Sequence, residues 1–221
     1  MFRKVLDLTP DNIRALNNLM AVYWYMKRDD MARAMFERSI AVRPNADAYS
    51  NLGTLEFFAG RYGEAVKMFE RSVGLDPGSS TIWGNLADSY RYVAGNEAKA
   101  REAYGRAIAL AEREKEINPR DAKLRARLAL YLAHAGRGEE AGIELDEALR
   151  LAPGSPAVLN KAVLVYERLG SRADAIEAAG RFLASGGTPA RLESDPDLAA
   201  MTKDPAFRAL VREAASGSRE R

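Results

Sequence analysis

Residues 80–111, STIWGNLADSYRYVAGNEAKAREAYGRAIALA, carry the most informative pattern of the chain. The stretch divides into two helical segments around Gly95, a residue type that suits a helix end because the backbone there takes a positive φ. In the second segment Ala100 and Tyr104 lie four residues apart, so a small and a large side chain share one helix face. The small residue lets paired helices approach, and the ring fills the adjacent space. The stretch therefore predicts an antiparallel helical hairpin.

The same pattern recurs along the chain, and proline marks its period. Proline ends the second helix of each hairpin because it lacks an amide hydrogen and disfavours helix in the preceding residue. The marker prolines lie 34, 33, 42 and 34 residues apart, at Pro10, Pro44, Pro77, Pro119 and Pro153. A period of this size is typical of a solenoid, in which each unit packs only against its neighbours.

The residue types within each unit resemble the tetratricopeptide repeat. Residues 80–111 have the family order of an aromatic, a Leu-Gly-like pair, Tyr, Ala and an aromatic, at Trp83, Leu86-Ala87, Tyr90, Ala100 and Tyr104. The resemblance implies an all-α fold, a right-handed superhelical solenoid of antiparallel helix hairpins with a C-terminal helical cap. It implies five units in residues 11–185, at about 13–45, 46–78, 80–119, 122–153 and 156–185.

The N-terminal residues depart from this pattern. Residues 1–10 read as the second helix of a truncated repeat, with Phe2, Val5 and Leu8 on its apolar face. Leaving a large apolar side chain exposed costs roughly 1.5–3 kcal/mol. We therefore expect either that the chain is a fragment of a longer protein or that another molecule covers this end, with homo-oligomerisation through the half-repeat as one such arrangement.

The chain departs from the repeat pattern at two further places, namely the 42-residue interval between Pro77 and Pro119 and the C-terminus. The excess residues, 111–118, read as two extra turns of the second helix, which add roughly 12 Å. In residues 186–215, Asp195-Pro196 and Asp204-Pro205 each predict a helix start, because Asp caps a helix and Pro favours its first position. We expect capping helices there and a disordered tail at residues 216–221.

The ending of the chain resembles the repeat arrays that follow bacterial serine/threonine kinase domains. Similar arrays follow bacterial cyclases and winged-helix transcription regulators. That resemblance implies a regulatory or oligomerisation module of a larger bacterial signalling protein. The chain has no kinase motif of its own.

The composition of the chain indicates which kinds of partner and which cellular compartment to expect. Lys plus Arg is 33 against 31 for Asp plus Glu, so the charge balance gives no argument for a nucleic-acid partner. No apolar run approaches the ~18 residues of a membrane span, and no signal peptide is evident. The chain has no cysteine, which fits a cytoplasmic protein without a thiolate metal site. We expect no cofactor and no membrane contact.

Three asparagines predict a peptide-binding groove. The resemblance implies that the residue before the core Leu of each first helix faces a concave groove, and Asn18, Asn51 and Asn85 occupy that position. An amide side chain offers both a donor and an acceptor to an extended peptide backbone. The alternative is that these asparagines serve only hairpin packing or solubility.

Aromatic residues accompany the asparagines in the first half of the chain. We expect Trp24, Tyr25, Phe58 and Tyr92 at groove-facing positions, where exposed rings are candidate anchors. The alternative is that these rings pack between neighbouring repeats.

Basic residues take the same positions in the second half. Lys123, Arg127 and Lys161 predict contact with a carboxylate or phosphate, with a solvated charged face as the alternative. Asn85, Lys123 and Arg127 also match three positions of the clamp by which chaperone-binding relatives hold a C-terminal carboxylate. Ser50 and Thr54 replace the other two, so we do not expect chaperone binding.

The sequence contains no set of residues with the composition and spacing of a catalytic or metal-binding site. His134 is the single histidine, and it lies at a helix end without a candidate nucleophile nearby. Glu193, Asp195, Asp197 and Asp204 lack the spacing of a metal loop. The sequence therefore predicts a non-catalytic interaction scaffold that binds a protein or peptide segment in its groove.

Overall fold

The structure, a computed structural model, describes residues 2–26 and 28–217. Within these residues every regular element is helical, and consecutive helices pair as antiparallel hairpins. The predicted all-α solenoid of helix hairpins is confirmed. The elements in chain order are α1 (Phe2–Leu8), α2 (Ile13–Tyr25), α3 (Asp29–Val42), α4 (Ala46–Phe58), α5 (Tyr62–Leu75), α6 (Ser80–Arg91), α7 (Glu97–Ile117), α8 (Ala122–His134), α9 (Gly138–Leu151), α10 (Pro156–Arg168), α11 (Arg172–Ala184), α12 (Pro189–Glu193), the 3-10 turns η1 (Pro196–Leu198) and η2 (Met201–Lys203), and α13 (Pro205–Gly217).

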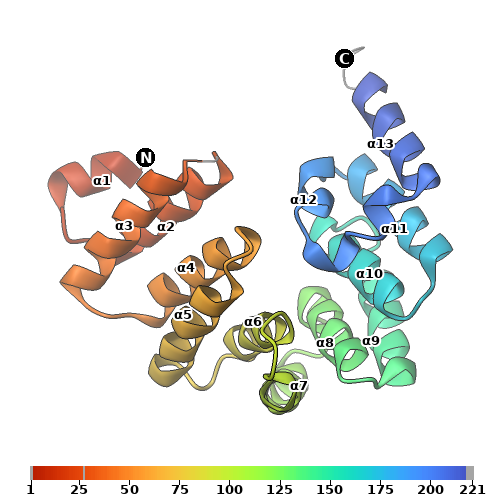
Figure 1. The fold of residues 1–221 in the computed structure, drawn as a ribbon, viewed down its shortest axis with the longest axis horizontal. Helices are drawn as coiled ribbons and strands as arrows, with labels where there is room; N and C mark the ends of the chain where they lie inside the picture. Colours follow the sequence, from red (N-terminus) through yellow and green to blue (C-terminus); the bar gives the residue numbers. More distant parts are fainter. Residues whose placement is uncertain (1, 27, 218–221) are drawn as a thin grey trace. The chain divides into compact units, whose positions relative to one another are not determined.

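The chain forms two compact units, residues 1–107 and residues 108–221, called here the first unit and the second unit. In Figure 1 the first unit runs from red to olive and the second from green to blue. The boundary falls within α7, which has 21 residues. This length agrees with the extra helical turns that the 42-residue interval predicts.

Short polar residues start the first helices, as local helix chemistry requires. The Asn12 and Asn45 side chains accept hydrogen bonds of 2.9 Å from the amides of Ala15 and Ala48, and Asp121 accepts from Leu124 at 3.0 Å. Such caps satisfy amide groups that have no partner inside the helix. The positive φ predicted at Gly95 is confirmed, at 81°, and the corresponding turn residues Gly60, Gly136 and Gly170 have φ between 74° and 80°.

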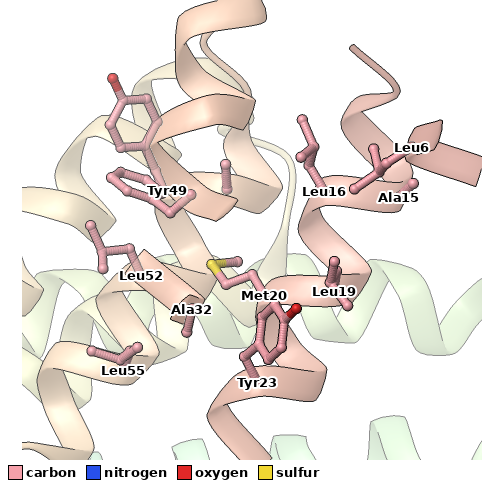
Figure 2. Close-up of a cluster of buried hydrophobic side chains, with 12 residues drawn as sticks. Leu6, Ala15, Leu16, Leu19, Met20, Tyr23, Ala32, Tyr49, Leu52 and Leu55 are labelled. Carbon is pink, nitrogen blue, oxygen red and sulfur yellow. The ribbon is translucent and has the colours of Figure 1, made fainter. Parts of the chain in front are cut away.

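The core of the first unit lies between the two helices of each hairpin and between neighbouring hairpins. Met20 and Tyr23 of α2 are buried together with Ala32 of α3 and Leu52 of α4. Leu6 of α1 belongs to the same cluster, and Figure 2 shows it beside Ala15 and Leu16 of α2. The half-repeat is thus docked through Leu6, whereas its neighbour Leu8 is 85% exposed.

In the second unit, α8 pairs with α9 and α10 with α11, and the residues after α11 cover the last hairpin. Leu192, Leu198, Met201 and Phe207 from this segment are fully buried or nearly so. The helix α13 extends to Gly217, so Ser216 and Gly217, which the sequence assigned to a disordered tail, lie in a helix. The rest of that predicted tail, residues 218–221, lies outside the described residues.

Candidate functional site

The three predicted groove asparagines occupy equivalent positions on α2, α4 and α6. We call the surface that bears them the inner face of the first unit. Asn18 is exposed, and Asn51 and Asn85 are half-buried. Within the described part of the chain, none of the three side-chain amides makes a hydrogen bond. Each amide therefore keeps its donors and its acceptor available to solvent or to a ligand.

An open pocket of about 670 Å³ joins two of these asparagines. Asn18 and Asn51 line it, and charged side chains stand beside them. The other lining residues are Ile13, Arg14, Asn17, Ala21, Arg43, Asp47 and Ser50. Asn85 is not part of this pocket, so the structure brings together two of the three predicted amides.

A ring of hydrogen bonds includes Asn17, one of the residues that line the pocket. The Ser39 hydroxyl donates to Asn17 Oδ1 at 2.7 Å, and Asn17 Nδ2 donates to Asn45 Oδ1 at 3.0 Å. Asn45 Nδ2 closes the ring by donating to the Ser39 oxygen at 3.2 Å. Because Asn45 also caps α4, the ring ties α2, α3 and α4 together. The sequence did not predict this ring, although Asn45, a residue type that caps helices, stands directly before a helical segment.

The predicted aromatic anchors pack against one another near the hairpin turns of the first unit. Trp24 lies 5.7 Å from Phe58 between ring centroids, and Phe58 lies 5.3 Å from Phe57. Phe57 contacts Tyr92 at 5.6 Å, and Tyr62 stacks on Tyr92 at 4.5 Å. These half-buried rings form a continuous wall, in line with the packing alternative. The side chain of Tyr25 lies outside the described residues.

In the second unit the predicted anion-contact residues differ in their surroundings. Lys123 is exposed. Arg127 is half-buried, and its Nη2 lies 3.1 Å from Glu114 Oε2 on the extension of α7. A carboxylate of the chain itself therefore already faces Arg127. Lys161 lies near the carboxyl group of Asp195, on the segment after α12.

The segment after α12 brings acidic side chains to α8 and α10, the first helices of the two hairpins in the second unit. His134 Nε2 at the end of α8 lies 3.6 Å from Asp197 Oδ2 of η1. Asp195 is 8% exposed. Burial raises the pKa of Asp195, and so does the charge of Asp197, whereas Arg191 and Lys161 oppose the increase. No sequence signal placed Asp197 against His134, because the two residues are far apart along the chain.

A buried glutamate with two basic partners appears in each unit. In the first unit, Glu56 pairs with Arg61 and, at 2.5 Å, with Arg33. Burial alone would raise the pKa of Glu56, but the hydrogen bonds from Arg61 and Arg33 outweigh it and hold this pKa below its ordinary value. In the second unit, Glu144 pairs with Lys115 at 2.6 Å and with Arg125 at 2.5 Å. These pairs join neighbouring helical segments, and none of their residues lines the pocket.

The described residues offer neither a metal cluster nor a helix suited to a membrane. Across residues 2–26 and 28–217, no cluster of three or more His, Cys, Asp or Glu side chains has the arrangement of a metal site. Among the helices that the structure describes, none combines the length and apolar character needed to cross a membrane.

Family comparisons agree with the repeat pattern. Family models described as "Tetratricopeptide repeat" match residues 13–78, 51–114 and 86–156, which together span residues 13–156. No curated protein matches the chain.

Solved structures of low sequence identity share the fold. TTC0263, a thermophilic TPR protein of Thermus thermophilus, superposes with a TM-score of 0.60 at 19% identity, covering 92% of this chain and 98% of that one. The APC/C hetero-tetramer Cut9–Hcn1 gives a TM-score of 0.58 at 18% identity, covering 96% of this chain and 38% of that one. Pseudomonas aeruginosa PilF gives 0.53 at 16% identity, covering 91% and 88%.

Proposed function

Since the chain belongs to the tetratricopeptide repeat family, whose members are protein-interaction scaffolds, we propose that it binds an extended segment of a partner protein on the inner face of the first unit. In this proposal the chain is a non-catalytic, cytoplasmic scaffold without a cofactor. The observation that supports it is the pair of asparagine amides, Asn18 and Asn51, at one open pocket.

The chemistry of this pocket matches that of a peptide backbone. An extended segment presents one amide donor and one carbonyl acceptor per residue, and these groups need partners when water leaves. An asparagine side chain supplies both kinds of partner in one group. Asn18 and Asn51 come from neighbouring first helices, so two points of one segment are held at once. Arg14 and Arg43 outnumber Asp47 at the same pocket and therefore favour acidic side chains next to the bound backbone.

The aromatic wall has a supporting role in this proposal. Its rings contact one another, so each loses little conformational freedom when a ligand arrives. Asn51 and Phe58 lie seven residues apart on α4, which places them on the same helix side two turns apart. A segment held by Asn51 therefore continues toward Phe58.

The test is peptide selection followed by matched substitutions. Peptides selected from a random library against the full chain are titrated against wild type and against Asn18→Ala/Asn51→Ala. The double variant should bind at least tenfold more weakly, because two amide contacts are lost. The exposed Asn118 gives the matched control, and Asn118→Ala should bind as wild type does. Equal affinity of the double variant and wild type would remove the inner face from the proposal.

A second candidate concerns the apolar side chains of α1. Leu8 is 85% exposed, while Phe2 and Val5 are half-buried. We propose that α1 associates with another copy or with a further part of a larger bacterial signalling protein, such as a kinase, cyclase or transcription regulator. Light scattering on wild type and Leu8→Ser tests the first form: a concentration-dependent increase in mass should occur in wild type and be reduced in the variant.

A further inference from the structure

The 3-10 turn η1 lies on α8 and α10, the first helices of the two hairpins in the second unit. It contacts α10, and its Asp197 reaches His134 at the end of α8. Arg127 and His134 lie seven residues apart and therefore share one side of α8. Arg127 and Lys161 correspond in the repeat to Asn18 and Asn51 of the first unit. We call the surface of α8 and α10 that bears Arg127, His134 and Lys161 the inner face of the second unit.

Apolar anchors hold η1 in this position. Leu198 within η1 is fully buried, as are Leu192 before it and Met201 after it. The side chain of His134 is only 1% exposed next to Asp197. The segment therefore covers part of the inner face of the second unit, whereas the corresponding face of the first unit has an open pocket.

The charges at this contact are complementary. Asp195 lies near Lys161 of α10 and near Arg191 of its own segment, and Asp197 faces the imidazole of His134. The carboxyl group of Asp195 is buried, and burial of a carboxylate is unfavourable unless its partners compensate for it. Its pKa is raised, so the compensation is incomplete. An acidic segment of another molecule meets the same basic groups, Lys161 and His134, at this surface.

We propose that the inner face of the second unit binds an acidic, extended segment of the Asp-Pro-Asp-Leu type, and that residues 195–198 occupy this surface in the isolated chain as a tethered competitor. The inference rests on the proposed function, since it assigns a partner chemistry to a second inner face. A partner binds there by displacing η1. Its apparent affinity is its intrinsic affinity multiplied by the fraction of molecules in which η1 is released.

The tether makes this competition strong. A segment joined by a short linker competes at an effective concentration on the order of millimolar. An added peptide of the same sequence therefore binds wild type weakly. Loosening the tethered segment, without altering Lys161 or His134, should reveal the surface.

The probe is the capped peptide SDPDLAAM, the sequence of residues 194–201, titrated against the full chain. Leu198→Ala removes the buried anchor of η1 and should raise the affinity for the peptide at least tenfold over wild type. The control Ala199→Ser changes an exposed neighbour and should leave the affinity at the wild-type value. Adding Lys161→Ala to Leu198→Ala should reverse the gain, and the peptide SNPNLAAM should not bind any variant.

A measurement on wild type covers the case in which Leu198→Ala does not fold. With SDPDLAAM well above the effective concentration of the tethered segment, which is on the order of millimolar, hydrogen exchange should become faster in residues 195–204 and slower in α8 and α10. The inference is overturned if exchange in both regions is unchanged, or if folded Leu198→Ala binds no better than wild type.

The two proposals fail separately. Asn18→Ala/Asn51→Ala should leave the gain of Leu198→Ala unchanged, because the asparagines belong to the first unit. If selected peptides bind the first unit and SDPDLAAM binds no variant, only this inference fails. If SDPDLAAM binds as expected and no library peptide depends on Asn18 or Asn51, only the proposed site in the first unit fails.

Discussion

The ring of Phe69 on α5 lies directly against the backbone of Gly53 on α4. A Cβ atom added at Gly53 would be 2.9 Å from Phe69 Cε1, closer than real Cβ contacts allow. Phe69 is buried at the centre of its hairpin and has little room to move. The close approach of α4 and α5 therefore depends on the absence of a side chain at Gly53.

Gly53→Ala should destabilise the protein for this reason. Overpacking a filled core costs about 1–3 kcal/mol, and urea unfolding followed by circular dichroism measures it. The matched control is Gly105→Ala in α7, where a Cβ would meet nothing within 4 Å. That change should stabilise by roughly 0.5–1 kcal/mol, because alanine favours helix over glycine. A neutral Gly53→Ala would contradict the contact.

Replacing either of two adjacent asparagines, Asn17 or Asn18, by alanine should affect the stability of the protein very differently. Asn17→Ala removes a member of the hydrogen-bonded ring with Ser39 and Asn45, and leaves buried polar groups without partners. It should cost about 1–3 kcal/mol in unfolding free energy. Asn18→Ala lies one residue away on the exposed side and should stay within about 0.5 kcal/mol of wild type. A similar loss for both variants would show that the ring is not what stabilises α2 against α4.

The pH dependence of the first unit should reflect Glu56. Its pKa in the folded chain is lowered from the ordinary value of 4.5, because hydrogen bonds from Arg61 and Arg33 outweigh the effect of burial. The stabilisation is therefore complete above pH 4.5 and is lost as the pH falls through the folded pKa. Glu56→Gln should destabilise by roughly 1–3 kcal/mol at neutral pH and unfold with a weaker dependence on acid. The exposed Glu37 provides the control, and Glu37→Gln should keep the wild-type acid profile.

Asp195 should give the opposite sign in the second unit. Burial, together with the charge of Asp197, raises its folded pKa above the ordinary value of 3.8. The folded chain then holds a proton that the unfolded chain releases, so stability falls as the pH rises from 3.8 through the folded pKa. Asp195→Asn keeps a side chain that can cap η1 and should remove this decrease. Urea midpoints measured from about pH 3.5 to 7 test it, and identical profiles for the variant and wild type would exclude this role of Asp195.

The hairpins were predictable from sequence because their determinants are local. Gly95 marks a turn by its backbone freedom, and the Ala100–Tyr104 spacing marks one helix face. The partners of the candidate site residues were not predictable, since they depend on contacts between distant segments. Arg127 meets Glu114, and His134 meets Asp197, only because separate helices pack together. The repeat pattern likewise assigned Trp24 and Phe58 to a face but did not predict their contact with each other.

The ring of Asn17, Ser39 and Asn45 limits how the pocket of the first unit can change during evolution. Asn17 lines that pocket and, through its hydrogen bonds to Ser39 and Asn45, also holds the junction between two hairpins. A substitution of Asn17 that alters ligand choice also loosens the junction. The side chains of Asn18 and Asn51 are not part of this ring. New binding specificities can therefore arise there by single substitutions without loss of the fold.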